Sequence, residues 1–133
     1  AQAAGFDPIV VDPREAFGSV ARFPDAKIVN DWPDEALDEI GVDARTALVL
    51  LTHDPKLDDP ALHVGLKSAA FYIGALGSSR THEARVTRLQ EEGFDAEQIA
   101  RINGPVGLNI GAAGPAEIAV SIMAQIIQTL RRT

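Results

Sequence analysis

The stretch FYIGALGSSR at residues 71–80 decides the fold, because it joins a predicted strand to a predicted helix through a glycine-rich turn. Glycines let the backbone approach an anion closely, and the N-terminus of a helix points free N–H groups at it. The two serines add hydroxyl groups, and the arginine adds a charge that can bind phosphate in a bidentate manner. The alternative is an ordinary glycine turn with a serine cap. We predict a phosphate site formed by Gly74, Gly77, Ser78, Ser79 and Arg80.

Apolar runs elsewhere in the chain predict a parallel sheet. Residues 46–52 (TALVLLT) are almost continuously apolar, which is typical of a strand covered on both faces. Helical segments alternate with the strands, and this order favours right-handed crossovers between parallel strands. The sequence therefore predicts one Rossmann-like α/β domain, with a doubly wound, mostly parallel sheet and helices on both faces. Strands are expected at residues 8–12, 27–30, 46–52 and 71–74, and helices at 32–39, 59–69, 79–92, from 95 to just before 104, and 115–130.

Caps and prolines set the expected helix ends. Asp31 is expected to cap the first helix, and Asp59, which precedes a proline, to begin the second. Asp95 and Gln98 have the spacing of a capping box. The last helix is apolar around most of its circumference, so we expect it to pack deeply.

Composition and charge exclude several classes of function. The chain has 133 residues, 46% of them hydrophobic, and no cysteine. Disulfides, thiolate metal sites and a sulfur-carrying thiol are therefore excluded on this chain, and a reducing cytoplasm is the expected location. The net charge of −7 argues against nucleic acid and anionic membrane partners. No apolar run is long enough to cross a bilayer, and residues 1–5 lack the features of a signal peptide.

A Rossmann unit has a strand and a glycine-rich turn before the segment that corresponds to residues 8–12. This sequence contains neither. We expect them on another chain or in a preceding segment, or else the fold dispenses with them. Loss of a central strand would expose an apolar sheet edge, so a partner, a swapped element or a homo-oligomer is also expected.

Two other strand ends carry polar candidates, because ligands of open α/β sheets collect beyond the carboxyl ends of strands. Asp12 and Arg14 can bind ribose hydroxyls and a 2′-phosphate, or can simply form a turn. Thr52, His53 and Asp54 follow the third predicted strand, where the histidine can donate to a ligand or serve as a structural residue. No spacing in the sequence predicts a metal site.

The segment GPVGLNIGAAGP at residues 104–115 is unusually rich in glycine. It can wrap the crevice and aim the dipole of the following helix at a ligand. The alternative is a loop made rigid by proline. We predict a lid over the ligand that includes Gly107, Asn109 and Gly111.

Several of these motifs, in this order and spacing, resemble the C-terminal Rossmann-like domain of the XdhC/CoxI family. Members of that family are maturation factors of xanthine dehydrogenase and carbon monoxide dehydrogenase. The resemblance rests on VVDPR (10–14), RFPDA (22–26), LTHDPKLDDPAL (51–62), YIGALGSSRTHEAR (72–85) and GPVGLNIGAAGPAEIAVSI (104–122).

The resemblance implies an accessory protein that binds the molybdenum cofactor, a phosphate-bearing pterin (molybdopterin) that is sometimes extended by a nucleotide. It implies protection of this cofactor, sulfuration by a partner cysteine desulfurase, and delivery to a molybdoenzyme apoprotein. No catalytic residue is implied. The family commonly has Asp where this chain has Asn109, and Thr where it has Gly114. An acid–base role at position 109 would therefore lack its carboxyl group.

Two other functions remain open at this point. One is an NAD(P)-binding oxidoreductase, for which Asp12 and Arg14 would hold the cofactor and His53 is the only candidate proton donor. The other is an interaction or dimerisation module with a vestigial ligand site. Binding of NADP or of molybdopterin separates these alternatives.

Overall fold

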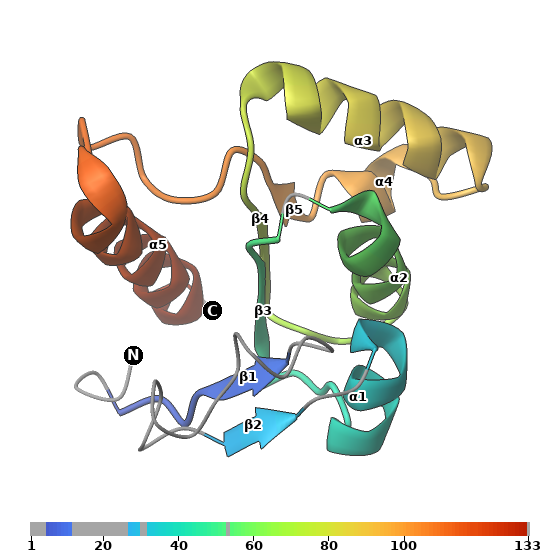
Figure 1. Ribbon diagram of the computed structural model, residues 1–133, viewed down its shortest axis with the longest axis horizontal. Helices are drawn as coiled ribbons and strands as arrows, with labels where there is room; N and C mark the ends of the chain where they lie inside the picture. Colours follow the sequence, from blue (N-terminus) through green and yellow to red (C-terminus); the bar gives the residue numbers. More distant parts are fainter. Residues whose placement is uncertain (1–4, 12–26, 30–31, 53, 133) are drawn as a thin grey trace.

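The computed structural model describes residues 5–11, 27–29, 32–52 and 54–132 of the chain. Strands alternate with helices along most of this length, and every strand pair is parallel (Figure 1). This arrangement confirms the predicted Rossmann-like α/β fold. The elements are β1 (Ile9–Val11), β2 (Lys27–Val29), α1 (Pro33–Ile40), β3 (Ala47–Leu50), α2 (Pro55–Leu66), β4 (Tyr72–Ala75), α3 (Ser79–Glu91), α4 (Ala96–Ile99), β5 (Ile102–Asn103) and α5 (Gly114–Arg131).

The strands form two parallel ladders. In the first, β1 pairs with β2, and Ile9 lies opposite Lys27. In the second, β4 lies between β3 and β5, and Gly74 is opposite both Val49 and Asn103. No ladder joins β1 to β3 among the residues that the structure describes, so two ladders stand where the sequence predicted one sheet.

Helices cover both faces of the β3–β4–β5 ladder, as predicted. Leu48 and Leu50 of β3 point to one face, where they pack with α1, α2, α3 and α4. Ala47 and Val49 point to the other face, where they pack with α5. Figure 1 shows α5 on one side of these strands and α1 and α2 on the opposite side. This alternation explains why the sequence of β3 is almost continuously apolar.

The last helix differs from its prediction, because it does not pack deeply on all its apolar sides. Val120 and Ile127 are 61% and 38% exposed, whereas Ser121 is buried. Gln125 also faces the sheet, and its Oε1 accepts a hydrogen bond from the buried Tyr72 hydroxyl at 2.5 Å. Burial raises the pKa of Tyr72 to about 12, so the phenol stays a donor. A buried hydroxyl needs a partner, and this need accounts for the inward position of Gln125.

The second helix begins four residues before its predicted start. The sequence holds two Asp-Pro pairs, at 54–55 and 59–60, and we assigned the start to the second. In the structure Asp54 is the N-cap, and its carboxylate accepts from the Lys56 N–H at 3.0 Å. Pro60 lies inside the helix, where it removes a single backbone hydrogen bond from a segment whose first turn is already capped.

The predicted helix that follows Asp95 is much shorter than expected. The capping box of Asp95 and Gln98 is confirmed, but α4 ends at Ile99. Residues 102–103 form β5 instead, and Ile102 lies opposite Ile73 of β4. Pairing with a buried neighbouring strand outweighs the weak helical tendency of so short a segment.

The helix α2 also ends earlier than predicted, at Leu66 instead of residue 69, and the remaining predicted helix ends agree with the structure to within about one residue. Gly41 ends α1 and Gly93 follows α3, both with positive φ. Trp32 occupies the N-cap of α1 without a side-chain hydrogen bond, and Asp31, the expected cap, lies outside the described residues. None of the described helices is both long enough and apolar enough to cross a membrane.

Candidate functional site

The turn between β4 and α3 lies at the carboxyl end of the central strand of its ladder. Gly77 has a φ of +138°, which L-residues with a side chain rarely adopt. Ser78 is the N-cap of α3, and its Oγ accepts from the Thr81 N–H at 3.2 Å. The turn therefore has the glycine and the serine cap that the sequence predicted.

The positive end of α3 carries no compensating acid. The first turn of α3 contains no acidic residue, whereas the first turns of the other four described helices contain Asp or Glu. Ser79 and Arg80 are exposed, and Arg80 forms no ion pair with any described residue. The helix dipole and this guanidinium together favour an anion at the turn.

The turn after β3 adjoins the turn after β4. The Leu76 N–H donates to the Leu50 carbonyl at 2.9 Å, so the backbones of the two turns are hydrogen-bonded. Thr52 donates from Oγ1 to Asp58 Oδ1 at 2.7 Å and accepts from the Asp54 N–H at 3.1 Å. The side chains of Thr52 and Asp54 thus hold the start of α2. His53, predicted between them, lies outside the described residues, as do Asp12 and Arg14.

Two buried charges lie beneath these turns. Asp58 of α2 is 4% exposed and Arg85 of α3 is 3% exposed. Arg85 donates from Nη2 to the Leu76 carbonyl at 3.3 Å. Burial raises the pKa of Asp58, opposed by the hydrogen bond from Thr52 and by the charge of Arg85. Burial lowers the pKa of Arg85, opposed by the charge of Asp58. Each charge therefore lowers the cost of burying the other.

The loop after β5 is bound to both β4 and α5. The Val106 N–H donates to the Ala75 carbonyl at 3.1 Å, and the Gly107 N–H donates to Gln125 Oε1 at 2.9 Å. Because Gln125 takes the Gly107 N–H, this group is not free for a ligand in the described arrangement. Asn109 and Gly111 are exposed, farther along the same loop.

His82 of α3 brings this loop against the first turns of the helix. A Cβ atom built on Gly104 would overlap the His82 ring, so the ring lies directly on the loop backbone. His82 Nδ1 is buried and has no hydrogen-bond partner among the described residues. Burial lowers the pKa of His82, and the charge of Arg85 lowers it further. The turns after β3, β4 and β5 thus meet at one edge.

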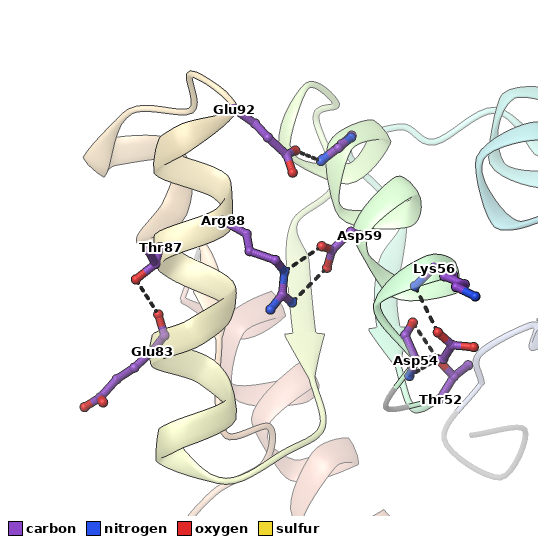
Figure 2. A network of polar contacts seen from close by, with 9 residues as sticks. Thr52, Asp54, Lys56, Asp59, Glu83, Thr87, Arg88 and Glu92 are labelled. Atoms are coloured by element: carbon purple, nitrogen blue, oxygen red, sulfur yellow. Dashed lines mark hydrogen bonds and ion pairs between the residues drawn. The ribbon is translucent and has the colours of Figure 1, made fainter.

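Two polar contacts join α2 to α3 away from that edge (Figure 2). Asp59 accepts from Arg88 Nε at 2.8 Å and from Arg88 Nη2 at 3.2 Å. His63 contacts Glu92 and stacks on Phe94, with ring centroids 5.3 Å apart. These contacts hold the two helices together and leave the turns untouched.

Sequence reasoning missed Asp58, His82 and Arg85 as parts of the site. An arginine on a helix surface is expected in solvent, whereas Arg85 is almost fully buried. One signal was available: Arg85 lies four residues before Leu89, so both belong to one face of α3, and Leu89 is buried. Asp58 had a weaker signal, between Leu57 and Ala61 on the buried side of α2.

No group of three His, Asp or Glu side chains among the described residues could hold a metal ion. An open groove of about 430 Å³ lies instead near the carboxyl ends of α1 and α2, where Gly41, Val42, Val64 and Lys67 line it. Since α2 runs back from the end of β3, this groove is distant from the edge that the turns form. The strand-end turns remain the candidate site.

Comparison with known proteins gives consistent matches. A family model described as the XdhC Rossmann domain matches residues 1–126. A Bacillus subtilis (strain 168) protein, named as a probable subunit of xanthine dehydrogenase, is 36% identical over 129 residues, which are 96% of this chain. The Escherichia coli (strain K12) protein named "Molybdenum cofactor insertion chaperone PaoD" is 36% identical over 102 residues, which are 77% of this chain.

A solved structure extends the match to three dimensions. A Bacillus halodurans protein described as a xanthine dehydrogenase superposes with a TM-score of 0.83 at 34% identity, over 99% of this chain. The chain covers 38% of that protein, and 37% and 31% of the two curated relatives. It therefore corresponds to about a third of each of these longer proteins.

Proposed function

Because this chain belongs to the XdhC Rossmann domain family, we propose that it binds the molybdenum cofactor and serves the maturation of a molybdoenzyme. The observation that carries the proposal is the turn after β4. There a helix N-terminus without acidic residues, a serine cap and Arg80, which has no ion-pair partner among the described residues, lie at the end of a central strand. Molybdopterin carries a phosphate, which is the kind of anion that such a turn binds.

The proposed ligand contacts combine three turns. The phosphate lies on the turn after β4, and the rest of the cofactor extends toward the turns after β3 and β5. The described hydrogen bonds support this arrangement, because they join all three turns. We propose as cofactor-binding residues Gly77, Ser78, Ser79 and Arg80, flanked by Thr52, His53, Asp54, Asn109 and Gly111, with Asp12 and Arg14 as further candidates. Gly74 and Gly107, which the sequence also predicted, support the turns and do not present free N–H groups to the ligand, because Gly74 is buried in β4 and the Gly107 N–H is bound to Gln125.

The proposal extends to partners. We propose delivery of the cofactor to an apoprotein of the xanthine or carbon monoxide dehydrogenase type, in the cytoplasm and from a homo-oligomer. Since the chain has no cysteine, the sulfur of the mature cofactor would come from a partner cysteine desulfurase. The name of the Escherichia coli relative, a molybdenum cofactor insertion chaperone, supports the proposed delivery of the cofactor.

Substitution of Arg80 tests the proposal. Arg80→Ala should weaken binding of molybdopterin at least about tenfold, because a charge-assisted hydrogen bond contributes roughly that much affinity. The measurement is a calorimetric titration with molybdopterin released from a purified molybdoenzyme. Arg45→Ala is the matched control: it removes the same charge from the exposed turn before β3, at the opposite end of the strands.

Three results would contradict the proposal. Equal affinity of the wild type and Arg80→Ala for molybdopterin would show that the phosphate does not bind at this turn. Saturable NADP binding with hydride transfer would favour an oxidoreductase. Absence of binding for both ligands would favour an interaction module.

A further inference from the structure

Two neighbouring turns of the site are each held by a buried charged side chain, and the two charges have opposite sign. Asp58 accepts from Thr52, which begins the turn after β3. Arg85 donates to the carbonyl of Leu76, in the turn after β4. Asp58 belongs to α2 and Arg85 to α3, so each charge reaches a turn that precedes its own helix.

These side chains are not fully satisfied by their partners. Asp58 Oδ2 and the Nε and Nη1 atoms of Arg85 are buried and have no hydrogen-bond partner among the described residues. Burial of incompletely hydrogen-bonded charges costs stability, and apolar residues of similar volume often pack better in such places. A pair that costs stability at the edge of a proposed ligand site is more readily explained by function than by folding.

We propose that Asp58 and Arg85 are positioning residues that act as a pair, fixing the turns after β3 and β4 relative to each other for the ligand. Asp58 and Arg85 form no ion pair with each other within 4.0 Å, so the coupling that we propose acts across the space between two buried charges, one bonded to Thr52 and the other to Leu76. Gly77 and Ser78 follow directly, so a displacement of either charge moves the phosphate-binding turn. The ligand part of this inference rests on the proposed function, whereas the coupling of the two turns does not.

The chain contains a matched control. Asp59 and Arg88 lie on the same two helices as Asp58 and Arg85, bind each other directly, and have side chains that are 14% and 36% exposed. Their hydrogen bonds go to each other and to neither turn (Figure 2). Loss of this pair therefore weakens the contact between α2 and α3 and leaves the turns in place.

The first test measures amide hydrogen exchange in the protein without ligand. Asp58→Asn should speed exchange of the Leu76 amide about tenfold, although Asp58 does not touch that turn, because coupled residues share energies of this size. Asp59→Asn should leave the Leu76 amide unchanged. Equal exchange at Leu76 in the wild type and Asp58→Asn would overturn the proposal.

The second test measures affinity for molybdopterin. Arg85→Met should weaken binding about tenfold, and the double variant Asp58→Asn/Arg85→Met should lose little more, because coupled effects are not additive. Arg88→Met should bind like the wild type. Arg85→Lys, which keeps the charge, should restore part of the affinity, and it replaces Arg85→Met if that variant does not fold.

The outcomes separate the two proposals. If the wild type, Arg85→Met and Arg85→Lys all bind molybdopterin with the same affinity, the positioning pair is wrong and the proposed function stands. Additive losses in the double variant would likewise overturn the pair. If the wild type binds no molybdopterin, the proposed function is wrong, and the exchange of the Leu76 amide alone decides whether the turns are coupled.

Discussion

Gly74→Ala is expected to lower the free energy of unfolding by about 1–3 kcal/mol, the usual cost of overpacking a close-packed interior. A Cβ atom at this position would lie 2.5 Å from Val106 Cγ2 and 2.7 Å from the Tyr72 hydroxyl oxygen. Neither neighbour can yield easily. Tyr72 is 2% exposed and hydrogen-bonded to Gln125, and the backbone of Val106 is bound to Ala75. Urea unfolding at constant pH measures the loss.

Gly65→Ala is the control for Gly74→Ala. It also adds one methyl group in the interior, but the nearest atom, at 2.7 Å, is Cδ2 at the far end of the Leu48 side chain. That side chain can rotate, and alanine in a helix gains about 1 kcal/mol over glycine. Gly65→Ala should therefore be close to neutral. Equal losses for both variants would show that the close approach at Gly74 does not limit stability.

Gly77→Ala is expected to weaken molybdopterin binding by about tenfold to a hundredfold, if loss of the turn geometry removes one to two charge-assisted hydrogen bonds. The φ of +138° is unfavourable for alanine, and the new Cβ atom would lie 2.8 Å from Thr81 Cγ2. Thr81 belongs to the first turn of α3, where its N–H donates to Ser78. Relief of the strain would therefore move the turn at which we propose that the phosphate binds. Calorimetric titration measures the change.

Gly93→Ala separates the effect on binding from backbone strain. Gly93 also has a positive φ, of +96°, and open space around its Cβ direction, after α3 and away from the site. Gly93→Ala should lose stability and keep full affinity. If Gly77→Ala binds as tightly as Gly93→Ala, the turn after β4 does not contact the ligand.

The sequence predicted the central strands and their turn because the signals are local. An apolar run followed by Gly77 and Ser78 predicts a strand, a turn and a helix without reference to distant residues, and the structure has all three. The end of α3 at Gly93 and the capping box of Asp95 were predictable for the same reason. The assignment of ligand contacts to these residues stays a prediction.

The errors arose where distant contacts decide between equal local signals. Asp54 and Asp59 both precede proline, and only the folded chain shows that the first of them caps α2. The strand at residues 102–103 is too short to have a periodicity, and pairing with β4 alone makes it a strand. The two-ladder arrangement of the sheet also depends on contacts that a local pattern does not encode.

The buried charges were missed for a related reason. Arginine and aspartate are rarely buried, so a sequence pattern assigns them to the surface by default. Asp58 and Arg85 are buried because each lies beneath a turn that its side chain holds, and these turns become neighbours only when β3 and β4 pair. The inward position of Gln125 on α5 was unpredictable for the same reason, because its partner Tyr72 on β4 is far away in the sequence.

We propose that the turn after β4 holds the phosphate of the molybdenum cofactor, and a map of backbone amide chemical shifts recorded as molybdopterin is added tests this binding site directly. We expect the largest changes at Gly77, Ser78, Ser79 and Arg80, with smaller changes at Leu76 and Thr52. Saturable binding with the largest changes elsewhere, such as in the groove beside Gly41 and Lys67, would contradict the claim.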